Sequence, residues 1–374
     1  MSTEYRINMK RYNGTDYDIM YPRTLIEQVT DGQRQIIVDS VSIGTSWSGT
    51  GPYTQTVVVD SADANSKIDI QPEANVINSL VEAGTTALYI VNNNGVFSAV
   101  AVGAAPTQAL TVQCTITKTA APPPPILNST LDENSWKAIK WASENNVGQN
   151  YWAVGDCKEI TMNGKVSDGL TLSNYTAWVY IIGFNHNAER EGNGIAFQGF
   201  KATKNGTPVC LVDSSYNGSK TSGAWFNMNN SDTNAGGWQA SLMRKNIMPL
   251  IKAAFPSDLQ AVIKTSTIFT AQDTGDIACT ATEDEVFLLA EFEVFGTRTY
   301  ASSQEQNYLK QYAYYAAGNS KVMYKHNATS STAFWWERSP WYDYHNSFCY
   351  VTIYGSANYI NAYIPYGVSP AFKV

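Results

Sequence analysis

Four consecutive prolines, Pro122–Pro125, divide this chain into two parts. Proline fixes φ, lacks a backbone N–H donor and favours an extended polyproline II spacer, so neither a helix nor a sheet continues through such a run. We therefore place a linker at 120–126 and expect the chain to fold as separate units before and after it.

The segment before the linker, 35–119, has the pattern of a small β-rich domain. YTQTVVVD and LTVQCTITKT alternate apolar and polar residues, and TALYIVNNNGVFSAVAVG has two apolar runs around Asn-Gly, a hairpin signal. NVINSLVEAG predicts one short helix that ends at Gly84. We expect an Ig-like or β-sandwich-like domain here. Residues 1–34 are polar and turn-rich, and we expect them to form an N-terminal attachment arm.

The segment after the linker, 127–374, predicts an α+β domain. LDENSWKAIKWASENN indicates a helix that Asp132 or Asn134 can cap, and YWAVGDCKEITMNG and TAWVYIIGFN follow with strand patterns. EVFLLAEFEVFG is interpreted as a further strand that carries Glu291 and Glu293 on one face. Early helices and late, irregular strands favour the α+β class.

Composition and charge exclude several classes of function. The formal net charge is -7, which argues against nucleic-acid binding because that requires a basic face. The N-terminus lacks the apolar segment of a signal peptide, and no apolar run reaches membrane-spanning length, so we expect no signal peptide and no membrane insertion. The five cysteines are dispersed without a CxxC pair, which predicts buried thiols, no metal site and no cofactor.

The segment from Phe334 to Phe372 is crowded with Tyr, Asn and Ser, and between Arg338 and Lys373 its one charged residue is Asp343. Tyr supplies a large amphipathic contact area with few rotatable bonds, and Ser and Asn supply adaptable hydrogen bonds. Tyr and Trp are also enriched among the residues that dominate binding energy. The tail is therefore interpreted as a binding surface. The alternative is an ordinary β-core with Tyr hydroxyls at its rim.

Three stretches resemble a bacterial and phage domain related to the C-type lectin fold and to formylglycine-generating enzymes. They are NYWAVGDCKEITMNG, DEVFLLAEFEVFG and WWERSP…FCYV…GSAN…YGVSPAF. That domain is also the ligand-binding end of variable proteins diversified by diversity-generating retroelements. This chain departs from it at Glu337, where the family commonly has an apolar residue. MKRYNGTDYDIMYPRT and WSGTGPYTQTVVVDSADANSKIDIQP resemble the arms of phage tail and fibre proteins and a small domain beside such arms.

The resemblance implies a non-enzymatic receptor-binding protein of a phage or prophage, such as a tail fibre. Its partners would be a host cell-surface protein or glycan and, through the arm, other virion or tail proteins. It would be assembled in the host cytoplasm, reside in the virion, and form a homo-oligomer, since fibre proteins often trimerise. The resemblance places the hypervariable target-binding positions between fixed framework residues, at Trp341, Tyr342, Asp343, Tyr344, His345, Ser347, Ile353, Tyr354, Tyr359, Ile360, Asn361, Tyr363, Ile364 and Tyr366.

Two other functions stay open at this point. One is a virion decoration or structural protein without a dedicated ligand. The other is a glycan-degrading tail enzyme, for which Glu291 and Glu293 would be the carboxylate pair. Cys349 stands alone, whereas the related formylglycine-generating enzymes use two cysteines. The Glu-Pro-Asn and Gln-Pro-Asp motifs of calcium-dependent sugar binding are missing from the tail, so we expect no calcium site.

Overall fold

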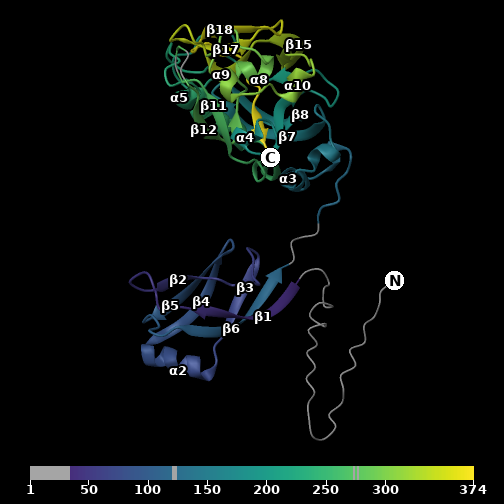
Figure 1. Cartoon of the computed structure of the whole chain (residues 1–374). Coiled ribbons are helices and arrows are strands. Elements are labelled where there is room, and N and C mark those ends of the chain that lie inside the picture. Colours follow the sequence, from purple (N-terminus) through teal and green to yellow (C-terminus); the bar gives the residue numbers. More distant parts are fainter. Residues whose placement is uncertain (1–33, 120–123, 273, 276–277) are drawn as a thin grey trace, which may run out of the picture. The chain divides into compact units, whose positions relative to one another are not determined.

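The computed structural model describes residues 34–119, 124–272, 274–275 and 278–374, which form two compact units, one up to Pro124 and one from Pro125. Each unit has its own apolar core, and Figure 1 shows that strands dominate both. The expectation of a multidomain, β-rich chain is confirmed. The predicted arm, apart from Arg34, and residues 120–123 of the predicted linker lie outside the described residues.

The first unit contains two three-stranded antiparallel sheets, ordered β1-β6-β3 and β2-β5-β4. Because side chains alternate along a strand, every second residue points inward, and both sheets contribute to one core, for example through Val112 and Phe97. The elements are β1 (Arg34–Ile43), β2 (Tyr53–Val57), β3 (Ser66–Gln71), α2 (Ala74–Ala83), β4 (Thr85–Asn93), β5 (Val96–Gly103) and β6 (Leu110–Thr119).

The hairpin turn and the helix of this unit form where the sequence predicts them. Asn94 and Gly95, the two residues between β4 and β5, have φ values of 53° and 92°. A two-residue type I′ hairpin turn requires positive φ at both positions, and Asn-Gly satisfies that requirement at low cost. The predicted helix is α2, and Gly84 ends it in the left-handed conformation.

The second unit is built around an antiparallel sheet ordered β13-β19-β9-β8-β7, accompanied by the smaller sheets β16-β17-β18, β10-β14-β15 and β11-β12. Its strands are β7 (Cys157–Ser167), β8 (Leu170–Phe184), β9 (Ile195–Lys201), β10 (Val209–Cys210), β11 (Ser266–Thr270), β12 (Thr280–Asp284), β13 (Val286–Phe287), β14 (Met323–Lys325), β15 (Ala328–Ala333), β16 (Trp335–Pro340), β17 (Ser347–Val351), β18 (Ala357–Asn361) and β19 (Ala371–Lys373).

The helices of the second unit are short. They are α3 (Trp136–Glu144), α4 (Ala188–Glu191), α5 (Gly237–Ala240), α6 (Met248–Ala254), α7 (Ser257–Gln260), α8 (Glu291–Phe295), α9 (Glu305–Tyr308) and α10 (Ala313–Ala316), with 3₁₀ turns at Leu131–Glu133 and Gly148–Asn150 and a π-helical turn at Met243–Ile247. None of the helices in the described part of the chain has both the length and the apolar character needed to cross a membrane.

Two expectations for this unit are wrong. The cap of α3 is Ser135, whose side chain accepts a hydrogen bond from the Ala138 amide at 3.2 Å. Asp132 instead accepts from the Glu159 amide at 2.8 Å. The second error concerns Glu291 and Glu293, which lie on α8 rather than on a strand. Glu293 accepts from the amide of Ala290, the residue that precedes α8, at 2.9 Å, and such a bond favours the start of a helix.

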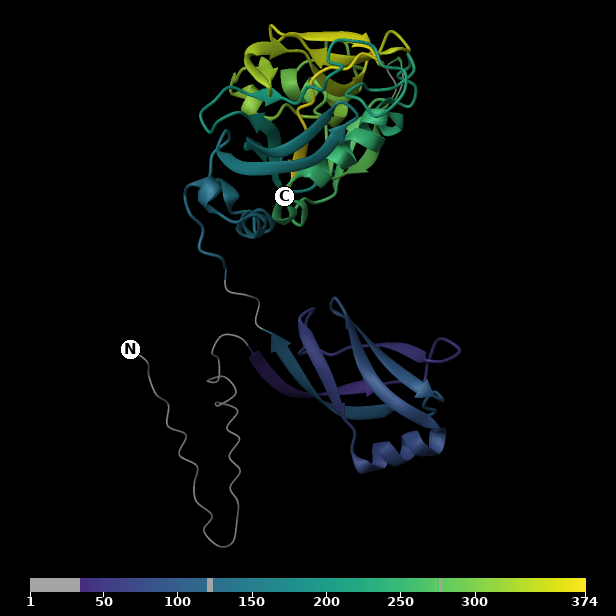
Figure 2. The same ribbon diagram turned by 180° about the vertical axis from the view of Figure 1, so that it is seen from behind.

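Figures 1 and 2 show where the tail lies within the second unit. The strands β17 and β18 gather with β15 at one end of this unit, whereas α3 and the C-terminal residue lie toward the opposite end. The tail sheet is therefore presented at one end of a single large core.

Candidate functional site

The candidate site is formed by the sheet β16-β17-β18 and the loops that join its strands (Figure 1). Of the predicted binding residues, some fall on the loop 341–346, some on the turn 352–356, and some on β18 and the segment just after it. We call the following set the tail surface: Trp341, Tyr342, Asp343, Tyr344, His345, Ile353, Tyr354, Tyr359, Ile360, Asn361, Tyr363 and Ile364.

The predicted binding residues differ in their solvent exposure. Tyr354 is 83% exposed and Tyr344 is 58% exposed, and Asp343 and His345 are exposed as well. The other residues of the tail surface are half-buried. Ser347 and Tyr366 are buried, and the Tyr366 ring packs among Phe334, Trp336 and Tyr350, so we assign both residues to the interior instead of the binding surface.

Aromatic rings on the tail surface stack on one another. The Trp341 ring centroid lies 3.4 Å from that of Tyr359 and 4.9 Å from that of Tyr344, with interplanar angles of 17° and 11°. Tyr300, from a distant part of the chain, meets Tyr359 edge-on at 5.0 Å. Such pairs contribute about 0.5–1.5 kcal/mol each beyond their buried area. The rings are therefore held in fixed orientations before any partner arrives.

One buried side chain fixes the path of the loop 341–346. Asn234 is fully buried, and its amide nitrogen lies 2.8 Å from the carbonyl oxygen of Tyr344 and 2.9 Å from that of Ser347. The carbonyl of Trp341 lies 3.2 Å away, and the backbone N–H of Asn234 donates to His345 at 2.8 Å. All four acceptors are backbone carbonyls, so the loop is held in the same way whichever side chains it carries.

The segment 213–236 supports the other tail loops in the same manner. Backbone amides of this segment donate to backbone carbonyls after β18: Asn217 to Pro365, Lys220 to Tyr363 and Asn229 to Ala362, at 2.7–3.0 Å. Asp232 adds a side-chain link, since it accepts from Asn361 at 2.9 Å and from Asn346 at 3.3 Å.

The turn that presents Tyr354 is closed locally. The Thr352 hydroxyl accepts from the amides of Tyr354 at 3.3 Å and Ser356 at 3.1 Å, and Gly355 has a φ of 79°. A glycine adopts this left-handed conformation without strain. The turn thus projects Tyr354 while its own backbone stays hydrogen-bonded.

Glu291 holds the loop that carries Tyr300. Its carboxylate is fully buried and accepts from the backbone amides of Thr299, Tyr300 and Ala301 at 2.6–3.1 Å. Burial raises the pKa of this carboxyl, although the three amides favour its ionised form. The same loop places the Arg298 guanidinium 4.8 Å from the Tyr342 ring centroid. A fixed cation and a fixed aromatic ring therefore adjoin the tail surface.

The burial of Glu291 and Glu293 argues against their use as a carboxylate pair for glycan cleavage. Glu291 and Glu293 are both 0% exposed, so neither carboxylate faces solvent where a glycan could reach it. Glu293 forms two hydrogen bonds with Arg338, at 2.6 and 2.8 Å. Arg338 also donates to Thr270, Leu288 and Phe269, so it lies at the centre of a buried hydrogen-bond network. Burial raises the pKa of the Cys349 thiol well above its usual range, as expected for a structural cysteine.

Sequence reasoning missed the residues that position the site, namely Asn234, Asp232, Arg298 and Tyr300, and it misread Glu291. The run of asparagines in NMNNSDTNAGG (227–237) was the one available signal, because such runs mark irregular loops stabilised by side-chain amides. Nothing local indicates which distant backbone these amides reach.

One family model matches the part of the chain that contains this site. Residues 212–374 match the model of a family described as a domain of unknown function, DUF6273. The matched region contains the supporting segment 213–236, α8 and the whole tail surface, so the site and its supports lie within one matched segment. No curated protein and no solved structure matches the chain.

Proposed function

We propose that this chain is a non-enzymatic recognition protein of a phage or prophage, in which the tail surface binds a host cell-surface protein or glycan. The first unit would be an Ig-like or sandwich-like spacer and the second a C-type-lectin-like domain. The predicted arm would attach the chain to other virion proteins.

The observation that carries this proposal is that, in the second unit, the exposed aromatic residues and the residues that hold the loop backbone are different sets. Exposed or half-exposed aromatic side chains gather on loops whose backbone is held by other residues. Asn234 and the segment 213–236 hold the loop 341–346 and the segment after β18, and Thr352 holds the turn of Tyr354. Ordinary surfaces seldom expose several large rings together, and clusters of that kind are characteristic of interaction sites. Since the supports bind backbone groups, the exposed side chains can change without loss of the loop path. That property suits a surface varied by a diversity-generating retroelement.

The proposal is tested with fluorescently labelled full-length chain and a panel of bacterial cells. The double variant Tyr344→Ser/Tyr354→Ser removes the two most exposed rings, and we expect adsorption to weaken at least tenfold, about 1.4 kcal/mol. Its stability in urea should fall by no more than about 1.5 kcal/mol, because both residues are largely exposed and the Tyr344 ring loses its stacking contact with Trp341.

The matched control is Tyr151→Ser, which removes a 44% exposed ring from the same unit but outside the tail surface. Its adsorption should equal that of the parent chain. Equal losses in the control and the double variant would contradict the proposal. Failure of particle assembly with unchanged adsorption would favour a decoration protein, and release of reducing sugars from host glycans would favour an enzyme.

A further inference from the structure

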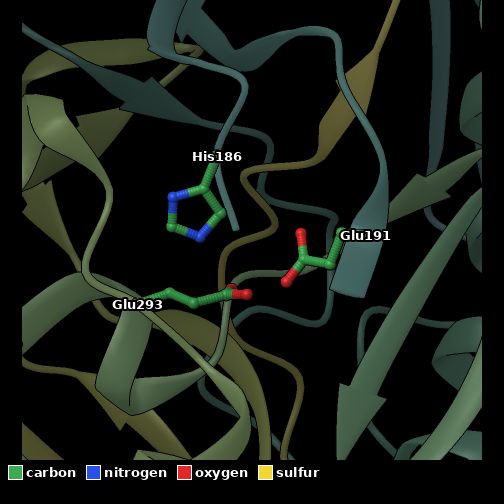
Figure 3. Close-up of side chains that lie close together, drawn as sticks. All are labelled: His186, Glu191 and Glu293. Atoms are coloured by element: carbon green, nitrogen blue, oxygen red, sulfur yellow. The ribbon is translucent and has the colours of Figure 1, made fainter. Parts of the chain in front are cut away.

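Three buried side chains of the second unit converge on one point, although they come from distant parts of the sequence. They are His186, Glu191 at the end of α4, and Glu293 on α8. One ligand atom from each lies within 4.8 Å of the others. Figure 3 shows the imidazole ring and the two carboxylates pointing toward one another.

A polar atom without a partner points into this cluster. His186 is 8% exposed, and no described residue forms a hydrogen bond with its Nε2 atom. The Tyr312 ring stacks on the imidazole at 3.6 Å, and its fully buried hydroxyl likewise has no hydrogen-bond partner among the described residues. Buried polar atoms almost always have a partner, so two orphaned atoms beside two carboxylates indicate a bound species.

We propose that His186, Glu191 and Glu293 bind a divalent transition metal ion such as Zn²⁺. One imidazole nitrogen and two carboxylate oxygens form a donor set that suits zinc, whereas Ca²⁺ and Mg²⁺ prefer oxygen ligands throughout. A tetrahedral zinc ion with ligands at about 2.1 Å separates them by about 3.4 Å, so the cluster has to contract slightly on binding.

The carboxylates keep the capacity to bind a metal despite their present contacts. Glu191 accepts one hydrogen bond on each oxygen, from Lys373 at 2.7 Å and from Asn187 at 2.8 Å. Oε1 of Glu293 accepts one, from Arg338 at 2.8 Å. A carboxylate oxygen has two lone pairs, so one remains on each of these atoms. Lys373 and Arg338 then act as outer partners that orient the ligands.

The surrounding core contains more buried acids than buried bases. Beside Arg338 and Lys373, the buried cations of this region, lie five buried carboxylates: Glu191, Glu291, Glu293, Glu305 and Glu337. No described residue hydrogen-bonds to either oxygen of Glu337 or to Oε1 of Glu305. Burying an uncompensated charge costs several kcal/mol, so this surplus has to be neutralised by protons or by a cation. Protons alone are the competing explanation.

A metal ion bound at this site would link several elements that lie beneath the tail surface. The ligands themselves join α4 to α8, and their outer partners lie on β16 and β19. Helix α8 also carries Glu291, which holds the loop of Tyr300. The metal would thus stabilise the second unit. The sequence predicted no metal site because it shows no short ligand spacing, and here the third ligand lies about a hundred residues beyond the first two.

The test uses untagged full-length chain that has been dialysed against a chelator and then given Zn²⁺. We expect one zinc ion per chain to survive gel filtration, measured by elemental analysis, and the melting temperature of the second unit to rise, because an ion bound only by the folded state stabilises it. His186→Gln should abolish both effects. Glu305→Gln, which alters a buried acid that is not a ligand, should retain both.

X-ray absorption at the zinc edge of the parent chain gives a result that does not depend on how well the variants fold. Imidazole nitrogen and oxygen scattering support the proposal. Sulfur scattering would place the ion on cysteines and overturn it. Failure of the parent chain to retain zinc, with an unchanged melting temperature, would also overturn it and leave protons as the neutralising species.

Discussion

Single buried side chains outside the tail set the geometry of the tail surface. Asn234 binds backbone carbonyls of the loop 341–346 and of Ser347, and Glu291 binds backbone amides of the loop 299–301. Backbone groups are common to all residue types, so these contacts specify a loop path without specifying the exposed residues. This arrangement separates the stability of the loops from their binding chemistry.

The contribution of Asn234 to the stability of the second unit can be measured directly. Asn234→Ala leaves buried carbonyls without their donor, and each such group costs about 1–3 kcal/mol, so we expect a loss of that size or larger in urea unfolding of the second unit. Asn234→Asp keeps the shape but lacks the amide donors, and should be similarly destabilised. Asn319→Ala is the control, because Asn319 is exposed and its amide donates to a single carbonyl, that of Tyr314. Equal losses for Asn234→Ala and Asn319→Ala would contradict the assigned role.

Secondary-structure elements were predictable where their signals are local. The β4–β5 hairpin follows from Asn94-Gly95 alone, and α2 ends where Gly84 requires it. In the run predicted as one strand, Val286–Phe287 is the strand β13, but Glu291–Phe295 is the helix α8. The helical part was misread because a short apolar run fits a strand and a helix equally well. The residues of the candidate site also differ in how far they could be predicted. The tail residues of the candidate site were proposed from composition, and their role in binding stays a prediction. Asn234 and Arg298 were missed because they act on residues that are far away in sequence.

The start of α3 illustrates a choice that local sequence leaves undecided. Asp132, Asn134 and Ser135 are all good capping residues, but Asp132 is engaged by Glu159, and Asn134 binds the carbonyls of Asn128 and Thr130. Ser135→Ala should therefore lower the stability of the second unit by about 1 kcal/mol, measured by urea unfolding. Ser135→Asp should restore most of it, because aspartate also accepts from the helix amides. An unchanged midpoint for Ser135→Ala would show that the cap contributes little.

The whole chain is expected to unfold in two steps, because each unit has a core of its own. Tryptophan fluorescence separates them, since Trp47 is the single tryptophan of the first unit and all the others follow Pro125. The surplus of buried carboxylates belongs to the second unit alone, so the two transitions should differ in their dependence on pH.

Burial raises the pKa of Glu305 to about 8. The hydrogen bond from Ser339 and the charge of Arg338 lower this pKa, but burial has the larger effect. Between pH 4.5 and 8 this carboxyl keeps its proton in the folded state and loses it in the unfolded chain, so stability falls as pH rises through that window. His186 and His326 oppose the trend only below their ordinary pKa of 6.5, because burial lowers the pKa of each to about 4.

The clear interval is therefore pH 6.5 to 8, where the proton held by Glu305 alone costs the second unit about 2 kcal/mol. Burial also raises the pKa of Glu337 well above its usual range, so its proton adds to the loss of stability over this interval. Glu305→Gln removes the titrating proton while its amide can still pair with Ser339, so its melting temperature should vary less across this interval than that of the parent chain. The first unit provides the internal reference, since these carboxyls are absent from it. A parent chain whose second transition is flat from pH 6.5 to 8 would show that the buried surplus is neutralised by something other than protons. A Glu305→Gln variant with the same slope as the parent would show that Glu305 does not titrate in this interval.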